Sequence, residues 1–315
     1  MRIIICTLML SVSPVAFASD AIFTLTDPRG DDHGWGKMTY PLRDDLHPGS
    51  LDLISLSAYP DGEGTMFEAV FASPVVPTAR RTIDSTGTSL DTVARFGFYT
   101  FNLDIYIDTD REAGMGSVEA LPGRRAEIDP AHAWEKVICL TPRPFETEDA
   151  LRRILKARAK REMKEKRGSI DDDQLTIIEA SIDRDVKVRY FFPTRIRVIG
   201  PKIRFLVPAA FLGGQAKLSW SYVVAISGAD IQQRLDIPAT LGLAEAAPES
   251  LMILPVSPGT WRDRFGGGYE DDNLLPPLID IIVPEGKKQE EVLKDYDLRN
   301  GRRVKLPGVV PIPSH

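Results

Sequence analysis

Short stretches rich in β-branched and aromatic residues recur along most of this chain, and Pro or Gly separates nearly all of them. The chain has 315 residues, of which 24 are Gly and 24 are Pro. Many short strands divided by turn residues favour an antiparallel sandwich over alternating β-α units, which need helical connections between strands. We therefore predict an all-β fold, with the strands packed as an antiparallel β-sandwich.

The clearest local signal is a hairpin. Residues 51–59 and 65–71 are β-rich and flank Pro60-Asp61-Gly62-Glu63-Gly64, a segment made almost entirely of turn-forming residues. The other predicted strands lie at 96–107, 135–140, 175–182, 186–192, 196–199, 203–207, 218–226, 251–254 and 278–283.

One segment interrupts this pattern and predicts a helix at about 147–168. It lacks Gly and Pro until Gly168 and begins with Glu148 and Asp149, as helices often do. Residues 152–167 include nine Lys or Arg, and three aspartates follow at 171–173. A basic helix can dock on a polyanion or a membrane surface. Its narrow apolar stripe favours instead a solvated helix, inserted between strands and neutralised by the aspartates.

The first 18 residues predict a cleaved signal peptide. Arg2 precedes the apolar run at 3–10, and Ala16-Phe17-Ala18 has the A-x-A spacing of a signal peptidase site. The apolar run is much shorter than the roughly 20 residues of a membrane helix, and no later segment is long and apolar enough to span a bilayer. We expect an extracytoplasmic protein, periplasmic or secreted, that is not membrane-spanning.

Charge and cysteine content restrict the partners and the source of stability. The formal net charge is -6, and it becomes one unit more negative when Arg2 leaves with the leader. An acidic protein of this kind is not expected to bind nucleic acid or anionic lipid. Only Cys139 remains after cleavage, so no internal disulfide can form, and we predict a buried, inert thiol.

An acidic, glycine-rich segment opens the predicted mature chain. Residues 27–36 read Asp-Pro-Arg-Gly-Asp-Asp-His-Gly-Trp-Gly, and Tyr40-Pro41 follow. Asp27, Asp31 and Asp32 in one tight loop repel one another unless something neutralises them, and carboxylates with backbone carbonyls are ligands that Ca²⁺ prefers. We name all three as candidate metal ligands. The alternatives are an Asx-type turn and neutralisation by Arg29.

A second acidic loop follows the predicted strand at 96–107. Asp104 and Asp108 lie about 13 Å apart along an extended strand, so they cannot share one ion. Asp108 and Asp110 belong to a loop that ends in Gly114, but the glycine position and the missing Glu do not fit an EF-hand. We expect Asp108 and Asp110 either to complete a calcium site with the opening aspartates or to form a structural turn.

Aromatic residues in loops are the candidate sugar-binding groups, because a pyranose ring packs an apolar face against a flat ring. Trp35 and Trp261 lie in glycine-rich loops, and Tyr40 and Tyr269 lie close to them in the sequence. We name these four as candidate ligand-binding residues, with the end of a sandwich core as the alternative place for the two tryptophans. Trp134 and Trp220 belong to strand patterns and are expected in the core.

Catalytic motifs are missing from the sequence. It contains no H-E-x-x-H, no G-x-S-x-G and no P-loop, and no pair of carboxylates stands out among its acids. We expect a protein that is not an enzyme.

A set of motifs in a fixed order is similar to the glucodextranase C-terminal-like domain. These motifs are Asp27-Pro28-x-Gly30-Asp31-Asp32-x-Gly34-x-Gly36, Tyr40-Pro41, Pro48-Gly49-x-Leu51-Asp52-Leu53, Leu103-Asp104-Ile105-Tyr106-Ile107-Asp108, Leu121-Pro122-Gly123-Arg124, Trp261 with Phe265-Gly266-Gly267-Gly268, and Leu278-Ile279-Asp280-Ile281-Ile282-Val283-Pro284.

The resemblance implies a DOMON-like, immunoglobulin-like β-sandwich related to family 9 carbohydrate-binding modules. It places the domain at residues 20–297, with the helix at 147–168 as an insertion and a Pro-rich tail at 298–315. It further implies a non-catalytic, extracytoplasmic module that binds a polysaccharide or a cell-envelope polymer, with calcium as a possible stabilising ion. Such domains usually accompany enzymes that act on α-glucans. Here a separate glycoside hydrolase is the expected partner.

Two alternatives come with this resemblance. Some DOMON-like domains bind haem and transfer electrons, which requires an axial pair such as Met with His. No spacing among His33, Met38, His47, Met66, Met115 and His132 selects such a pair, so haem is not expected. The other alternative that the resemblance implies is an accessory protein of an α-glucan-degrading enzyme. Apart from the resemblance, a hydrolase with an unrecognised site also stays open.

Overall fold

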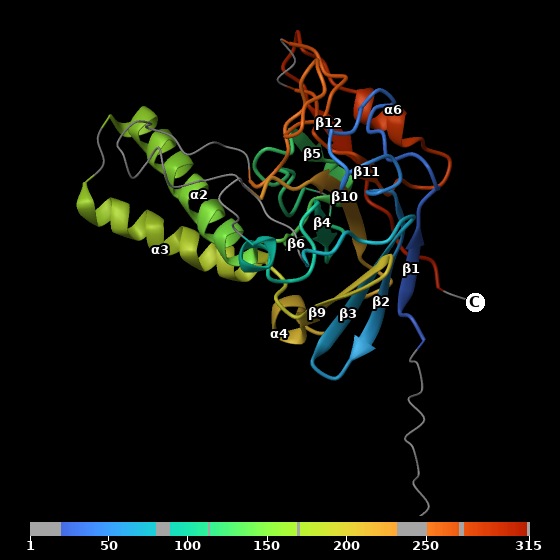
Figure 1. The fold of residues 1–315 in the computed structure, drawn as a ribbon. Helices are drawn as coiled ribbons and strands as arrows, with labels where there is room; N and C mark the ends of the chain where they lie inside the picture. The colour runs from blue at the N-terminus through green and yellow to red at the C-terminus, as the bar shows by residue number, and fades with distance from the viewer. Residues whose placement is uncertain are drawn as a thin grey trace, which may run out of the picture.

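The structure, a computed structural model, describes residues 20–79, 89–112, 114–168, 171–231, 251–270 and 274–313. The predicted signal peptide lies outside the described residues. The described residues form two five-stranded sheets, one two-stranded sheet and several helices (Figure 1).

The first sheet has the strand order β1-β2-β3-β9-β8, and its neighbouring strands are all antiparallel. Its strands are β1 (Phe23–Thr26), β2 (Leu53–Asp61), β3 (Gly64–Phe71), β8 (Ile196–Ile199) and β9 (Lys202–Pro208). The predicted hairpin is confirmed as β2 and β3. In its turn the backbone N–H of Glu63 donates to the Asp61 carboxylate at 2.9 Å, a local bond that favours the reversal.

The second sheet has the strand order β11-β10-β4-β6-β7. Its strands are β4 (Phe101–Asp108), β6 (Lys136–Leu140), β7 (Tyr190–Phe191), β10 (Ser221–Gly228) and β11 (Asp280–Ile281). The pairing of β6 with β7 is parallel, whereas the other pairings in this sheet are antiparallel.

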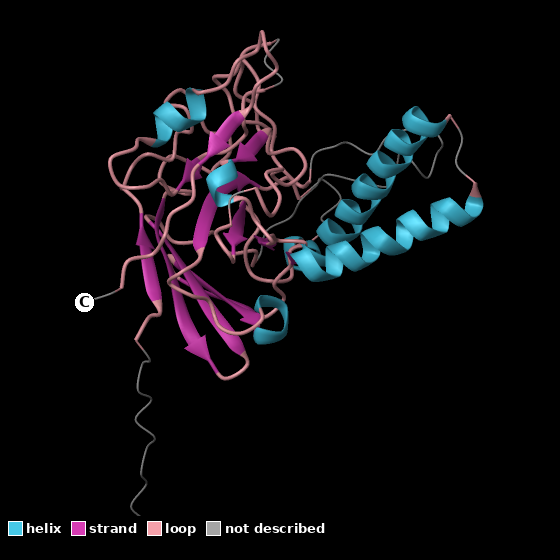
Figure 2. Ribbon diagram, turned by 180° about the vertical axis from the view of Figure 1, so that it is seen from behind, coloured by secondary structure: helices cyan, strands magenta, loops and turns pink. Residues whose placement is uncertain are grey.

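The two sheets face each other across one hydrophobic core. Phe23 of β1 meets Tyr222 of β10 with ring centroids 4.6 Å apart, and Phe71 of β3 meets Phe101 of β4 at 4.7 Å. Both pairs join the first sheet to the second, so the predicted β-sandwich is confirmed (Figure 2). Trp134, Trp220 and the free thiol of Cys139 are buried, as predicted.

Strand β4 is buried on both faces, although its sequence alternates apolar and polar residues. Its polar side chains find partners in loops that cover the sheet. Asp104 forms a buried ion pair with Arg124 at 2.7 Å, and the Asn102 amide donates to the Met252 carbonyl at 2.9 Å. The predicted strand at 251–254 is part of this cover and makes only a single bridge, between Ala229 and Ile253.

A small parallel sheet joins β5 (Ala126–Ile128) to β12 (Val304–Leu306). The segment 298–315, predicted as a tail, thus contributes a strand whose Val304 and Leu306 are buried. The short helices are α1 (Leu90–Val93), η1 (Pro130–His132), α4 (Ala209–Leu212) and α6 (Gln289–Lys294).

Two long helices, α2 (Pro144–Arg167) and α3 (Asp172–Arg189), form a hairpin that projects from the sandwich (Figure 1). Helix α2 confirms the helix predicted at about 147–168. The strand predicted at 175–182 is wrong, because α3 covers all of it. The strand predicted at 186–192 is confirmed only at β7, because α3 continues to Arg189. None of the described helices combines the length and hydrophobicity needed to cross a bilayer.

Local chemistry explains why α3 forms. The Asp171 carboxylate accepts from the Gln174 N–H at 2.7 Å and caps the helix, and Asp172 and Asp173 favour its N-terminus. Ion pairs then bind α3 to α2: Asp183 contacts both Arg152 and Lys156 at 3.0 Å. The acidic run therefore starts a second helix, which in turn neutralises the basic one.

Candidate binding face and acidic clusters

The opening acidic segment lies against the far end of the chain. The Gly34 N–H donates to the Ile279 carbonyl at 2.9 Å, and the side-chain amide of Gln289 in α6 donates to the Asp31 carbonyl at 2.5 Å. Gly30 has a positive φ of 87°, which turns the chain so that neighbouring aspartates point to different places. The structure consequently separates the three aspartates that the sequence places together.

Asp32 braces the local fold. It is buried, and its carboxylate accepts bonds from the Tyr40 hydroxyl and from the Gly49 N–H, the latter at 2.7 Å. Asp32 therefore has hydrogen-bond donors of its own and stands outside the group that Asp27 and Asp31 join.

Asp27 and Asp31 meet Asp280, a residue that the sequence analysis did not propose as a metal ligand. One carboxylate oxygen from each of the three lies within 4.8 Å of the others, and we call this group the sheet-edge cluster. Asp27 follows β1, Asp280 belongs to β11, and these are edge strands of the two different sheets. The cluster therefore bridges the sandwich at one open side.

The sheet-edge cluster is buried and short of hydrogen-bond donors. Asp280 is 0 % exposed, and although its Oδ2 accepts from the Leu53 N–H at 2.7 Å, its Oδ1 is buried without a partner. Both carboxylate oxygens of Asp27 and one of Asp31 are also buried without a partner. Buried carboxylate oxygens normally have donors or bind a cation, so this arrangement fits a cation.

Burial and mutual repulsion disfavour the charged forms of these acids. Burial, followed by the charge of Asp31, raises the pKa of Asp27 to about 8. Burial raises the pKa of Asp31 to about 6, and burial together with Asp27 raises the pKa of Asp280 well above its usual range. A divalent cation would remove the repulsion that contributes to these shifts.

Asp52 lies next to the sheet-edge cluster. Its Oδ2 accepts from the Gly30 N–H at 2.9 Å, whereas its Oδ1 is buried without a partner. Burial, followed by Asp32, raises its pKa. Asp52 and Asp280 share a signal that sequence reasoning could have used, since each interrupts an otherwise apolar strand-like run.

Asp108 and Asp110 form a second cluster with Glu135. In strand β10, Ser221 pairs with Asp108 of β4, and Ile226 pairs with Asp280 of β11. Because Ser221 and Ile226 are five residues apart in the strand, the two clusters lie roughly 17 Å apart. The expectation that Asp108 and Asp110 complete a site with the opening aspartates is therefore wrong.

The second cluster has local hydrogen-bond donors, although Glu135 Oε1 is buried without a partner. Asp108 accepts from the Arg111 N–H at 2.6 Å, and Glu135 accepts from the Thr109 N–H at 2.7 Å. Burial raises the pKa of Glu135, and Asp110 is exposed. These bonds match the structural turn that the sequence left open as an alternative.

Two of the four candidate aromatic residues are core residues. Trp35 is 3 % exposed and Tyr40 is 9 % exposed, and the Tyr40 ring packs edge-on against Phe265 at 5.5 Å. The expectation that Trp35 offers an open platform is wrong, because its loop is bonded down onto Ile279. Contacts so distant in the sequence are not visible in the local pattern around Trp35.

The other two aromatic residues lie on the surface. Trp261 is 61 % exposed and Tyr269 is 58 % exposed, and both belong to the loop at 256–270. Backbone bonds hold this loop against the opening segment: Leu42 N–H donates to the Trp261 carbonyl at 3.0 Å, and Thr39 and Gly266 form a bridge. The Trp261 backbone is thus anchored while its ring remains open to solvent.

A cavity of about 690 Å³ adjoins this loop. Segment 38–48 supplies most of the residues that line the cavity. One of them, the exposed Leu42, connects the cavity to Trp261 through its backbone hydrogen bond. Its polar groups include Arg43, which is paired with Asp45 at 2.6 Å, and the imidazole of His47. We call Trp261, Tyr269, Leu42 and this cavity the Trp261 face.

Comparison with known proteins identifies the chain's family. No curated protein matches the sequence. The model of the C-terminal, SLH-like binding module of glucodextranase matches residues 22–308, which is nearly the whole chain. That family is a binding module and not a catalytic domain. The match includes the sheet-edge cluster, the Trp261 loop and both long helices, and the chain therefore belongs to the glucodextranase C-terminal binding-module family.

Proposed function

We propose that this protein is a secreted, non-catalytic carbohydrate-binding module that uses the Trp261 face and is stabilised by Ca²⁺ at the sheet-edge cluster. Membership of a binding-module family supports the general role. The exposed indole of Trp261 on an anchored loop is the observation that carries the choice of face.

The Trp261 face has the groups that sugar binding requires. The indole of Trp261 and the ring of Tyr269 offer flat apolar surfaces for the faces of pyranose rings. Arg43 and His47, in the adjoining cavity, offer polar atoms to the ring hydroxyls. Because bonds to the opening segment already order the Trp261 loop, binding would cost little further loop entropy.

The donor atoms of the sheet-edge cluster suit calcium. Ca²⁺ is a hard cation that binds several carboxylate and carbonyl oxygens, and Asp27, Asp31 and Asp280 have carboxylate oxygens without a hydrogen-bond partner. Asp52 offers a further oxygen nearby. An ion held there would tie the edge of one sheet to the edge of the other.

The proposal also includes a ligand, a cellular location and a partner. We expect an α-glucan or another cell-envelope polysaccharide as ligand, an extracytoplasmic location after cleavage of the predicted leader, and a separate glycoside hydrolase as partner. Haem has no part in this proposal.

Retention on insoluble α-glucan tests the binding face. We expect Trp261→Ala to lower retention at least about fivefold, because stacking on one aromatic ring contributes about 1–3 kcal/mol in related stacking interactions. Phe145→Ala is the matched control, since Phe145 is also an exposed aromatic residue but lies on α2. Equal retention of the two variants and the unchanged protein would contradict the choice of face.

A further inference from the structure

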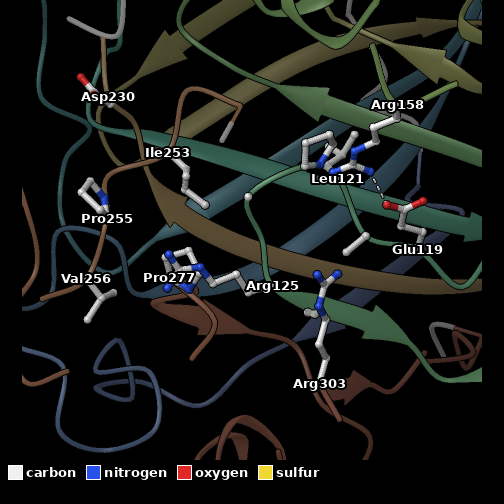
Figure 3. Close-up of a pocket in the computed structure, with 14 residues that line it drawn as sticks. Glu119, Leu121, Arg125, Arg158, Asp230, Ile253, Pro255, Val256, Pro277 and Arg303 are labelled. Atoms are coloured by element: carbon white, nitrogen blue, oxygen red, sulfur yellow. Dashed lines mark hydrogen bonds and ion pairs between the residues drawn. The ribbon is translucent and has the colours of Figure 1, made fainter. Parts of the chain in front are cut away.

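A second pocket, of about 550 Å³, lies on the outer side of the second sheet. Its lining comes from the loop at 119–126, from residues 253–256, and from Pro277, Arg158 of α2 and Arg303 beside β12 (Figure 3). The Trp261 face and the sheet-edge cluster contribute no residue to it. We call it the arginine pocket.

Three guanidinium groups give this pocket its name. Arg125, Arg158 and Arg303 come from three separate segments and line it together (Figure 3). Arg158 is ion-paired with Glu119, whereas Arg303 is exposed and has no acidic partner among the residues that the structure describes. Guanidinium groups bind carboxylate and phosphate oxygens with paired, charge-assisted hydrogen bonds.

Hydrogen bonds hold the loop at 119–126, which lines the pocket. Arg124 is buried in its ion pair with Asp104 and also donates to the Leu251 carbonyl at 2.7 Å. The Tyr106 hydroxyl accepts from the Leu121 N–H at 3.0 Å. Arg125 has a φ of 52°, an uncommon left-handed conformation for a residue other than Gly. Arg124 therefore points into the core, whereas its neighbour Arg125 points to the pocket. The hydrogen bonds of this loop position Arg125 before a ligand binds.

The remaining lining suits a ligand larger than an inorganic ion. Ile253, Pro255, Val256 and Pro277 supply an apolar wall. Asp230 stands at one end of the pocket and Glu119 at the other (Figure 3). Carboxylates accept hydrogen bonds from hydroxyl groups, and a pocket of this size is typical of small-molecule sites. The lining thus offers cationic, apolar and hydroxyl-accepting groups at once.

We propose that the arginine pocket binds a saccharide that carries a carboxylate, such as a hexuronate unit of an acidic polysaccharide. The carboxylate meets the guanidinium groups, the ring lies against the apolar wall, and ring hydroxyls donate to Asp230 or Glu119. This inference rests on the proposed carbohydrate-binding function and adds a second, charge-selective site to it.

Calorimetric titration with trigalacturonate tests the inference, with its methyl ester and maltotriose as uncharged comparisons. We expect Arg125→Gln and Arg303→Gln each to weaken trigalacturonate binding about tenfold, the usual effect of losing a hydrogen bond between charged groups. Arg197→Gln, an exposed arginine on β8 of the other sheet, is the matched control and should bind as the unchanged protein does. The methyl ester should bind the unchanged protein at least tenfold more weakly than the acid does.

Three results would overturn the inference: equal affinity for the acid and its ester, loss of binding in the Arg197 control alone, or binding of glucose 6-phosphate in place of the uronate. The ester comparison uses only the unchanged protein, so it decides the question even where a variant fails to fold. Failure of this inference is distinguishable from failure of the proposed function, because Trp261-dependent retention on α-glucan is measured independently.

Discussion

At the scale of single residues, the aspartates of the opening segment have two different roles. Asp32 accepts bonds from Tyr40 and Gly49 and holds the loop together, whereas Asp27 and Asp31 turn toward Asp280. A run of aspartates therefore contains both a structural brace and candidate cation ligands. The side chains' hydrogen-bond partners distinguish these roles, and the residue type does not.

Asp280→Asn tests the cation ligands. In calcium we expect the melting temperature of this variant to fall below that of the unchanged protein, because one ligand is lost. In EDTA we expect it to be equal or higher, because the amide of Asn cannot carry the charge that burial and Asp27 disfavour at this position. Differential scanning calorimetry with and without EDTA measures both effects. A melting curve of the unchanged protein that is the same with and without EDTA would exclude calcium.

The pH dependence of stability follows from the raised pKa values. Asp27 has a pKa of about 8 in the folded protein against 3.8 ordinarily, so between about pH 4 and 8 the folded state binds more protons than the unfolded state. Stability therefore falls as pH rises through this window, and Asp31, with a pKa of about 6, adds to the fall in its lower part.

The expected result is a melting temperature in EDTA that decreases from pH 5 to pH 8. Calcium competes with these protons, so its stabilising effect should increase over the same range. Thermal melts in matched buffers measure both trends. A calcium effect that is larger at pH 5 than at pH 8 would argue against these carboxylates as the ligands.

At the scale of elements, strand β4 and the helical hairpin show two ways to accommodate charge. Strand β4 buries Asp104 and satisfies it with Arg124 from a covering loop. The hairpin keeps its charges at the surface, where Asp183 joins α3 to two basic residues of α2. The buried pair fixes a loop in place, whereas the surface pairs neutralise a helix that would otherwise repel itself.

Arg124→Ala tests the buried pair. Removing one partner leaves Asp104 charged in the core, which costs about 3–5 kcal/mol in comparable proteins. The double variant Asp104→Leu with Arg124→Met removes both charges and should be less destabilised than Arg124→Ala. Urea unfolding measures the two free energies of unfolding. A single variant as stable as the double one would mean that the pair does not hold the loop.

At the scale of the whole molecule, short strands and turn residues were enough to predict a sandwich, the β2-β3 hairpin and helix α2. Helix α3 was missed because its β-branched residues suggest strands, whereas Ile178, Ile182 and Val186 recur every four residues and share one helical face. The burial of Trp35 and the meeting of Asp27 with Asp280 depend on contacts between the two ends of the chain. Local patterns carry no information about such contacts.

Export of the whole protein is itself testable. We expect the secreted form to begin at Ser19, directly after Ala18 of the predicted cleavage site. Mass spectrometry of the protein recovered from the periplasm or the medium measures its N-terminus. Recovery of the protein only from the cytoplasm, with Met1 intact, would contradict the extracytoplasmic location.

The order of synthesis determines when the contacts between the opening segment and residues 279–309 can form. The opening loop is hydrogen-bonded to Ile279 and Gln289, and Tyr222 of β10 forms a bridge with Val309, so early segments depend on segments that are synthesised much later. Native pairings of such long sequence separation form slowly. A nascent chain that ends before Ile279 therefore lacks these contacts and strand β11. For the exported form that we propose, we expect this delay to favour passage through a translocation channel before folding is complete.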